Sequence, residues 1–342
     1  MTTSPASASP ASARSGPRPP GAVLITGSGS GIGAATAVAA ALAGYRVVAS
    51  VHSLDRVDDL RSRIASAEAG VLDIEFRELD VTSQQAAAAL LADIVARYGA
   101  LHAVISNAGI TRMGTFENEP VESYRRVFDV NFFGPIALLK RAMPHLRASH
   151  GRIIAVSSLN GVVSTPFQEA YNASKFALEG ALESLAPVAR RVGVDVSVVA
   201  PGPTSDTHIW QTIDIAGFRA AATSPYTEVI DRYFANAADG LLTDLPAGQL
   251  AAEVAQVIVG VLGSDEPAFR YTTSTVGTEL LARKLVDPTG DTLVARTGSW
   301  LDRQPTPAAL ADPVPADPVP ADPVPADPVP ADPVPAGPVP AE

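Results

Sequence analysis

A glycine-rich turn between a short apolar run and a helical pattern constrains the fold of this chain more than any other feature. The turn reads TGSGSGIG over residues 26–33, follows the apolar run at 22–25, and leads into a helical pattern from Ile32 to Ala43. Glycines at 27, 31 and 33 allow a tight turn, close approach of a ligand to the backbone, and close packing of helix on strand. Free N–H groups at the start of a helix attract phosphate. The segment therefore predicts a loop that binds a nucleotide pyrophosphate; the alternative is an ordinary glycine-rich turn. The expected contacts are Gly27, Ser28, Ser30, Gly31, Ile32 and Gly33.

Apolar runs alternate with helical patterns between residues 21 and 301. We expect strands near 22–27, 46–51, 73–79, 103–107, 152–157, 195–200 and 269–273, with helices between them. This alternation is typical of a parallel sheet covered by helices on both faces. The prediction is an α/β fold, a single Rossmann-type doubly wound parallel sheet. The longest apolar stretch, at 36–51, is interrupted at 44–46 and falls short of the roughly 20 residues that a membrane span needs, so we expect no membrane-spanning segment.

A tyrosine and a lysine four residues apart carry the strongest chemical signal. Tyr171 and Lys175 are placed on one face of a helix by this spacing. A nearby ammonium favours the phenolate and lowers the pKa of a tyrosine, which makes the phenol a better proton donor and acceptor at neutral pH. Ser158 follows the apolar run at 152–157 and could hydrogen-bond a substrate oxygen on which charge develops. Alone, the Tyr–Lys pair is also common on protein surfaces, but together with the glycine-rich loop it predicts redox chemistry between a carbonyl and an alcohol.

These residues, in this order, resemble the short-chain dehydrogenase/reductase family. The resemblance covers about residues 21–301 and includes the TGxxxGxG loop, the Asn107-Ala108-Gly109 motif and the catalytic set Asn131, Ser158, Tyr171 and Lys175. Further matches are an adenine-contacting pair, Asp80 and Val81, and a turn after the sixth strand, Pro201 and Gly202. Ser158 is preferred over Ser157 because it stands thirteen residues before Tyr171, a common spacing in the family.

The resemblance implies a role for each member of the set. Tyr171 would deliver a proton to the carbonyl oxygen while hydride arrives from the nicotinamide, and Ser158 would polarise the carbonyl. Lys175 would assist Tyr171 and bind the nicotinamide ribose, and Asn131 would anchor a water that connects Lys175 to solvent. From the sequence alone, a mid-helix asparagine more often faces solvent. No metal site is expected.

The later part of the chain is similar to the branch that contains 17-beta-hydroxysteroid dehydrogenase type 1 and the retinol dehydrogenases. The similarity is carried by residues 171–180, 270–273 and 287–291, and it implies bulky apolar alcohols and ketones as substrates. Asn236 stands where the steroid enzyme has a histidine and Thr275 where it has a glutamate, which puts steroid specificity in doubt.

The end of the second predicted strand bears on the choice of cofactor. An acidic residue there would bind the ribose hydroxyls of NAD and repel a 2′-phosphate. Val51 occupies that place, while His52 stands where NADP-using relatives often carry arginine, and Arg56 lies one turn further on. NADP(H) is therefore favoured over NAD(H), and the alternative is that His52 is simply a solvated residue.

The family resemblance implies that the segment after Gly202 covers the substrate. Between 203 and 245 it offers Ile209, Trp210, Ile213, Phe218, Tyr226, Tyr233 and Phe234. Such a segment favours a hydrophobic ketone, aldehyde or alcohol over a sugar, although some of these residues belong to helix cores. Two other function classes were weighed: an epimerase or dehydratase that retains its nucleotide, and a catalytically silent protein that senses NADP or serves as a scaffold through its proline-rich tail. The intact catalytic set favours the oxidoreductase.

Both ends have biased composition. Residues 1–20 consist mostly of Ser, Ala and Pro, and the repeat Ala-Asp-Pro-Val-Pro occurs five times from Ala311. We expect a disordered N-terminal extension at 1–20, one domain at 21–301, and a disordered tail at 302–342 that acts as a spacer or as a ligand for a proline-recognition domain.

Charge and composition bound the partners. The net charge of −11 argues against a nucleic-acid surface, and the absence of cysteine excludes disulfides and thiol catalysis. Without a segment that resembles a signal peptide, we expect a cytoplasmic protein. The family resemblance implies a homodimer or homotetramer that pairs through helices near 120–148 and 169–192.

Overall fold

The computed structural model describes residues 21–67, 70–207, 209, 215–221, 226–238 and 248–292. The chain divides into two compact units, residues 1–301 and residues 302–342. The described residues all belong to the first unit. The expected extension at 1–20 and the repeat tail lie outside the described residues.

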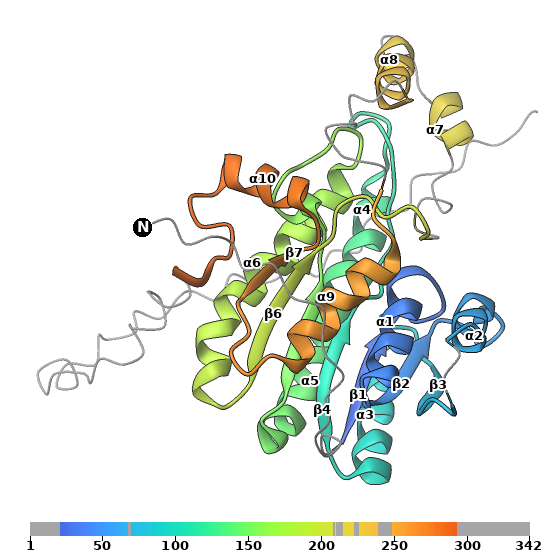
Figure 1. The fold of residues 1–342 in the computed structure, drawn as a ribbon. Coiled ribbons are helices and arrows are strands. Elements are labelled where there is room, and N and C mark those ends of the chain that lie inside the picture. The colour runs from blue at the N-terminus through green and yellow to red at the C-terminus, as the bar shows by residue number, and fades with distance from the viewer. Residues whose placement is uncertain are drawn as a thin grey trace, which may run out of the picture. The chain divides into compact units, whose positions relative to one another are not determined.

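Seven parallel strands form one sheet in the order β3-β2-β1-β4-β5-β6-β7 (Figure 1). The strands are β1 Ala22–Thr26, β2 Arg46–Val51, β3 Ile74–Glu78, β4 Leu101–Ser106, β5 Arg152–Val156, β6 Asp195–Ala200 and β7 Arg270–Thr272. All seven lie close to the expected positions, so the prediction of a doubly wound Rossmann-type sheet is confirmed. β1 is buried along its whole length, as a central strand covered on both faces must be.

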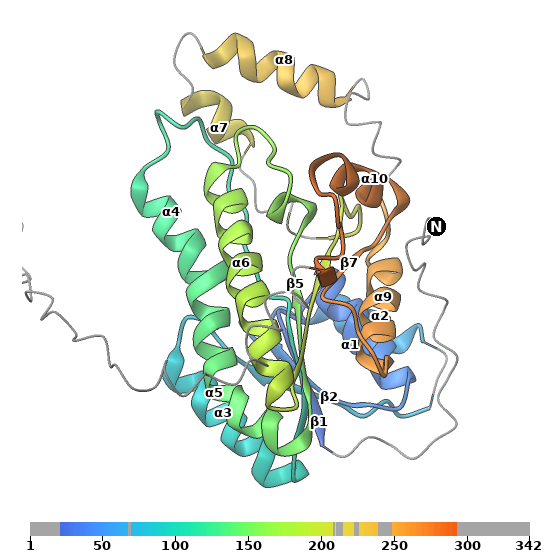
Figure 2. The ribbon, with the colours of Figure 1, turned by 90° about the vertical axis from the view of Figure 1, so that its left-hand side faces the viewer.

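Helices cover both faces of the sheet, as the edge-on view of Figure 2 shows. One face carries α3 Gln84–Tyr98, α5 Gly134–Ser149 and α6 Glu169–Arg191, which share a buried core with β1, β4, β5 and β6. The opposite face carries α1 Gly31–Leu42 and α9 Ala251–Gly263. The other described helices are α2 Asp58–Ala65, α4 Val121–Phe128, a π-helix η1 Asp129–Phe133, a 3₁₀ turn η2 Leu159–Gly161, α7 Ile215–Ala221, α8 Tyr226–Ala238 and α10 Thr275–Lys284. No helix in the described part of the chain is both long and apolar enough to cross a membrane.

Local signals explain where the helices begin and end. The side chain of Ser83 accepts a hydrogen bond from Ala86 N at the start of α3, and the helix stops at Gly99, which has a φ of 79°. Glycine adopts this left-handed conformation at little cost, which makes it a common residue at the end of a helix. These boundaries set the length of the helix, and its apolar face then packs on the sheet.

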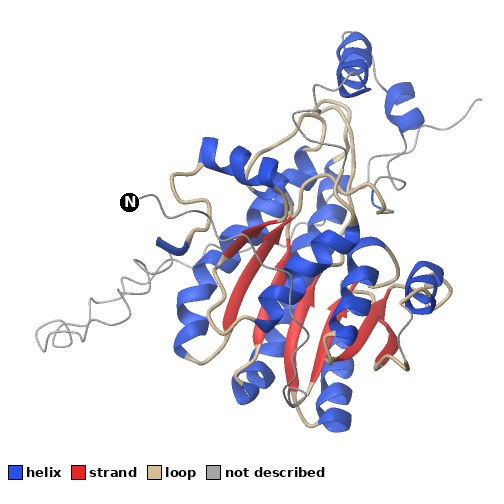
Figure 3. Cartoon of the chain, in the orientation of Figure 1, coloured by secondary structure: helices blue, strands red, loops and turns tan. Residues whose placement is uncertain are grey.

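The strand order reverses between β1 and β4, because the chain runs outward from β1 to β3 and then returns. Ligands of open parallel sheets bind in the crevice at this switch point, outside the carboxyl ends of the strands. Figure 3 shows the loops that follow β1 and β4 at the same edge of the sheet. The topology therefore places the glycine-rich loop at the expected ligand site.

Candidate active site

The glycine-rich loop after β1 is joined to the loop after β4. Thr26 Oγ1 accepts hydrogen bonds from the backbone N–H groups of Asn107 and Ala108, each at 3.0 Å. Asn107 Nδ2 donates to Thr26 O at 2.9 Å and to Gly27 O at 3.1 Å. Asn107 and Ala108 of the predicted motif therefore hold the phosphate loop in shape from its inner side.

Close packing explains the glycines of the loop. A Cβ atom at Gly33 would lie 2.2 Å from Gly27 O and 2.5 Å from Asn107 Nδ2. Gly27 has a φ of 68°, and a Cβ there would lie 2.7 Å from Ala108 Cα. No other residue type fits either position without movement of the backbone, so the close packing of this loop requires glycine at both positions.

Ser28 and Ser30, the two serines expected to contact the cofactor near the N-terminus of α1, make different contacts. Ser28 is buried and donates from Oγ to Ile25 O at 2.9 Å, so this side chain supports the loop. Ser30 is the residue before α1, and its side chain makes no capping hydrogen bond there. The N–H group of Gly31, the first helical residue, donates to Asp59 Oδ2 at 2.8 Å. Sequence reasoning missed Asp59, because no motif connects α2 to this loop.

The end of β2 presents a histidine and no carboxylate. Val51 is buried, whereas His52 and Arg56 are exposed. A Cβ atom at Gly29 would lie 2.6 Å from Arg56 O, so the turn that carries Arg56 rests directly on the phosphate loop.

Asp80 and Val81 lie beyond β3. Asp80 is exposed, and its Oδ1 accepts hydrogen bonds from Thr82 N at 2.9 Å and Thr82 Oγ1 at 2.7 Å. These bonds lower the pKa of Asp80. The carboxylate is therefore held in a tight turn at the edge of the site.

Tyr171 and Lys175 lie one turn apart on α6, and both are buried, with exposed fractions of 8% and 4%. Lys175 Nζ lies 5.7 Å from the centre of the Tyr171 ring and donates to Val156 O, at the end of β5, at 3.1 Å. The expected placement on one helix face is confirmed. Because both side chains are buried, this pair differs from the Tyr–Lys pairs that are common on protein surfaces.

Burial shifts the pKa values of both groups. It raises the pKa of Tyr171 above the usual value, while a hydrogen bond with Ser158 acts in the opposite direction. It lowers the pKa of Lys175 from 10.5 to about 8, against the negative charge of Glu179. The expected fall in the pKa of Tyr171 is therefore not found in this geometry, because desolvation of the phenol outweighs the hydrogen bond.

The two candidate serines face different surroundings. Ser158 follows β5, contacts Tyr171, and accepts a hydrogen bond from Asn160 N at 3.1 Å. Ser157 is buried beside Gly161, where a Cβ atom would lie 2.6 Å from Ser157 Oγ and 2.4 Å from Glu179 Oε1. Ser158 is therefore the serine on the Tyr171 side, and Ser157 belongs to a separate polar cluster.

Asn131 lies in the π-helix η1 and is almost fully buried. Its Oδ1 accepts from Ile110 N at 2.9 Å, and its Nδ2 donates to Ile110 O at 2.9 Å and Ser174 Oγ at 3.1 Å. Gly109 lies against it, because a Cβ there would be 3.4 Å from Asn131 Oδ1 and 3.6 Å from Lys175 Nζ. Asn131 thus joins the loop after β4 to α6, and it does not face solvent as an ordinary helical asparagine would.

The turn after β6 borders the same site. Pro201 O accepts from Leu159 N at 2.9 Å, and Gly202 O accepts from Gln249 Nε2 at 3.2 Å. Pro201 and Gly202 therefore stand between the loop that follows β5 and carries Ser158 and the segment that leads into α9.

Aromatic side chains gather around Phe167, in the loop that leads to Tyr171. Phe167 has a φ of 62° in the loop before α6, and its ring centre lies 5.5 Å from that of Phe218 and 5.2 Å from that of Tyr233. These contacts bring α7 and α8 to the loop that leads to Tyr171. Trp210 and Ile213, as well as the side chains of Phe234 and Asn236, lie outside the described residues.

The chain matches the family model described as short chain dehydrogenase over residues 21–216. The chain belongs to the short-chain dehydrogenase family. Members act on CH–OH groups with NAD(P) as cofactor, so this protein is an oxidoreductase with a nicotinamide cofactor. The prediction made from the glycine-rich loop and the catalytic set is thereby confirmed at the level of the family.

Several relatives of this short-chain dehydrogenase act on retinoids or steroids, as their names state. Retinol dehydrogenase 8 of Bos taurus is 34% identical over 76% of this chain and 83% of its own length. The 17-beta-hydroxysteroid dehydrogenase type 1 of Mus musculus is 30% identical over 81% of this chain and 80% of its own. A crystal structure of a short-chain dehydrogenase from Streptomyces avermitilis is 26% identical, with a TM-score of 0.64, over 82% of this chain and 96% of that one. The expected branch is confirmed.

Proposed function

We propose that this short-chain dehydrogenase transfers hydride between NADP(H) and a hydrophobic ketone, aldehyde or secondary alcohol. The observation that carries the proposal is the arrangement of the buried Tyr171 and Lys175 with the half-buried Ser158 at the carboxyl edge of the sheet. A phenol that is protected from water and contacts a serine can exchange a proton with a substrate oxygen. Bound NADP(H) supplies or accepts the hydride.

Each residue has a distinct task in this proposal. In the reductive direction Tyr171 donates its proton to the carbonyl oxygen, and Ser158 holds that oxygen with a hydrogen bond. Lys175 keeps a positive charge near the phenol and is available to the nicotinamide ribose. Asn131 holds the backbone of the loop after β4 beside Lys175, through the bonds with Ile110.

The phosphate loop and the end of β2 support NADP(H) as the preferred cofactor. Gly27, Ser28, Ser30, Gly31, Ile32, Gly33, Asn107, Ala108 and Gly109 would surround the dinucleotide. Asp80 and Val81 would flank the adenine, while Pro201 and Gly202 would border the nicotinamide. At the ribose, exposed His52 and the absence of a carboxylate at Val51 favour a 2′-phosphate.

The aromatic cluster supports a hydrophobic substrate. Phe167, Phe218 and Tyr233 pack together next to the loop before Tyr171. By contrast, the polar residues of that loop are engaged with one another, because Asn160 Nδ2 lies within hydrogen-bonding distance of oxygens of Thr165, Gln168 and Asn172. Apolar surface is therefore what this side of the site offers, in keeping with the retinoid and steroid substrates that the relatives' names state.

A homodimer or homotetramer is part of the proposal. Exposed apolar side chains occur where α4, η1 and α5 run beside α6, among them Phe133, which is 56% exposed, and Phe176. We expect light scattering after size exclusion to give a multiple of the chain mass. A monomer would contradict the proposed oligomeric state but not the proposed hydride transfer.

The deciding experiment is oxidation of NADPH and NADH against steroid ketones, retinaldehyde, long-chain ketones and quinones, with Tyr171→Phe as control. Turnover that falls by a factor of about 10² or more in the variant supports the proposal. Turnover that survives in Tyr171→Phe would remove Tyr171 from its role. If no compound of the panel is turned over although NADPH binds tightly, the alternative of a catalytically silent protein that senses NADP would be favoured.

A further inference from the structure

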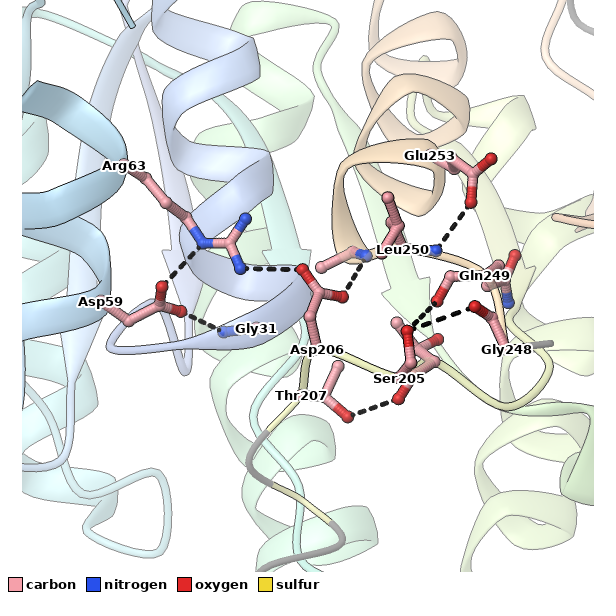
Figure 4. Close-up of polar contacts among 12 residues, drawn as sticks. Gly31, Asp59, Arg63, Ser205, Asp206, Thr207, Gly248, Gln249, Leu250 and Glu253 are labelled. Atoms are coloured by element: carbon pink, nitrogen blue, oxygen red, sulfur yellow. Dashed lines mark hydrogen bonds and ion pairs between the residues drawn. The ribbon is translucent and has the colours of Figure 1, made fainter. Parts of the chain in front are cut away.

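Three side chains of alternating charge connect the N-termini of two helices (Figure 4). Asp59 accepts from Gly31 N at 2.8 Å and from Arg63 Nε at 2.9 Å. Arg63 Nη2 donates to Asp206 Oδ2 at 3.0 Å, and Asp206 Oδ1 accepts from Ala251 N at 2.6 Å. Gly31 begins α1 and Ala251 begins α9. One guanidinium therefore balances two carboxylates, each of which caps a helix.

The ion pair of Asp59 and Arg63 is much less exposed than the neighbouring ion pair on the same helix. The side chains of Asp59 and Arg63 are 24% and 23% exposed. By contrast, the neighbouring pair on the same helix, Asp58 and Arg61, is 92% and 68% exposed, with its charges 3.9 Å apart. Helix α2 thus carries one ordered ion pair that faces the phosphate loop and one solvated pair that faces away from it.

The carboxylate of Asp59 lies where an anionic ligand is expected. Gly31 N–H is the first donor of α1, and the N-terminus of the helix that follows the first strand binds the pyrophosphate in this fold. The partial positive charge there favours one anion, and a second anion beside it is repelled. Asp59 and a pyrophosphate oxygen therefore compete for the same N–H group.

We propose that Asp59 is a placeholder for the pyrophosphate and thereby sets the affinity of the chain for its cofactor. Its carboxylate occupies Gly31 N–H until the dinucleotide binds, and Arg63 then holds that carboxylate to one side. Asp59 weakens cofactor binding and favours release, while Arg63 reduces the repulsion between Asp59 and the phosphates. The inference rests on the proposed cofactor site, and it requires neither a particular substrate nor turnover.

Two variants with effects of opposite sign test it. Asp59→Asn keeps an oxygen for Gly31 N–H but removes the charge, so NADPH and NADH should both bind about two- to tenfold more tightly. Arg63→Met leaves the carboxylate of Asp59 unbalanced, so binding of both should weaken by a similar factor. Asp58→Asn and Arg61→Met make the same changes of charge in the solvated pair and should stay within about twofold of the unaltered chain.

The measurement is calorimetric titration of the full chain with NADPH, NADH, ADP-ribose and adenosine at two salt concentrations. Opposite signs for Asp59→Asn and Arg63→Met with ADP-ribose, reduced by salt and absent with adenosine, support the placeholder. Weaker or unchanged binding in Asp59→Asn overturns it and makes Asp59 a structural cap of the loop. Either result leaves the hydride-transfer proposal intact, because binding is measured without substrate, and thermal melts of each variant exclude a loss of folding as the cause.

Discussion

At the scale of single residues, burial changes the pKa values of the residues in the catalytic motif. Lys175 would titrate near 10.5 at the protein surface, but inside α6 its pKa is about 8. Desolvation disfavours the charged ammonium, and the carboxylate of Glu179 on the same helix face acts in the opposite direction. The lysine therefore changes its charge within the range of pH over which the enzyme can be assayed.

This shift predicts a pH dependence of reduction. Lys175 is protonated below its pKa, so the charge that supports Tyr171 is present below about pH 8 and is lost above it. We expect kcat/KM for the ketone, at saturating NADPH, to decline as the pH rises through 8. In Lys175→Arg the guanidinium stays charged, so any remaining activity should lack this decline; an identical decline in both proteins would assign it to another group.

We expect the residues at the end of β2 to determine the preference for NADPH over NADH. His52→Arg places a permanent charge where the 2′-phosphate would lie, so the ratio of NADPH to NADH affinity should rise about fivefold. Val51→Asp places a carboxylate there and should lower the ratio. Fluorescence titration of both variants measures it, and a ratio unaltered by either change contradicts the assignment of this strand end to the ribose.

At the scale of elements, a buried ion pair joins α6 to β7. Arg270 Nε and Nη2 both lie 2.9 Å from Glu179 Oε2, and the two side chains are 6% and 4% exposed. Arg270 also lies 3.6 Å from Glu183, which is 36% exposed. Because Glu179 follows Lys175 by one turn, this pair fixes the helix that carries the catalytic residues against the far edge of the sheet.

Removal of one partner should destabilise the fold. Glu179→Leu leaves the guanidinium of Arg270 buried without its main counter-ion, so the free energy of unfolding should fall by about 3–5 kcal/mol. Addition of Arg270→Met should restore much of the loss. Denaturant titration measures the series, with Glu183→Gln as a control expected to cost less than about 1 kcal/mol. A double variant as unstable as Glu179→Leu would argue against the charge as the cause.

At the scale of the whole molecule, the described residues form one doubly wound sheet, and residues 302–342 form a separate unit. We propose that this second unit is a tail that serves neither folding nor catalysis. A chain that ends at Leu301 should keep kcat/KM within about twofold and its Tm within about 2 °C. Enzyme assays and thermal melts check this, and a loss of turnover with an unchanged Tm would give the tail a role in the site.

The sequence by itself determined the sheet, its covering helices and the residues of the catalytic set, because each depends on a short pattern. Apolar runs specify strands, the glycines at 27 and 33 specify the loop, and the spacing from Tyr171 to Lys175 specifies a shared helix face. Each of these signals spans only a few residues and can be recognised without knowledge of the fold.

Only the tertiary structure decided the rest, because those contacts join positions far apart in the chain. The π-helix that turns Asn131 inward, the pair of Glu179 with Arg270, and the placement of Asp59 on Gly31 have no local pattern. Burial also set the direction of the pKa shift at Tyr171, against the expectation from its neighbouring lysine. Desolvation depends on the packing around a group, and that packing is fixed only once the helices lie on the sheet.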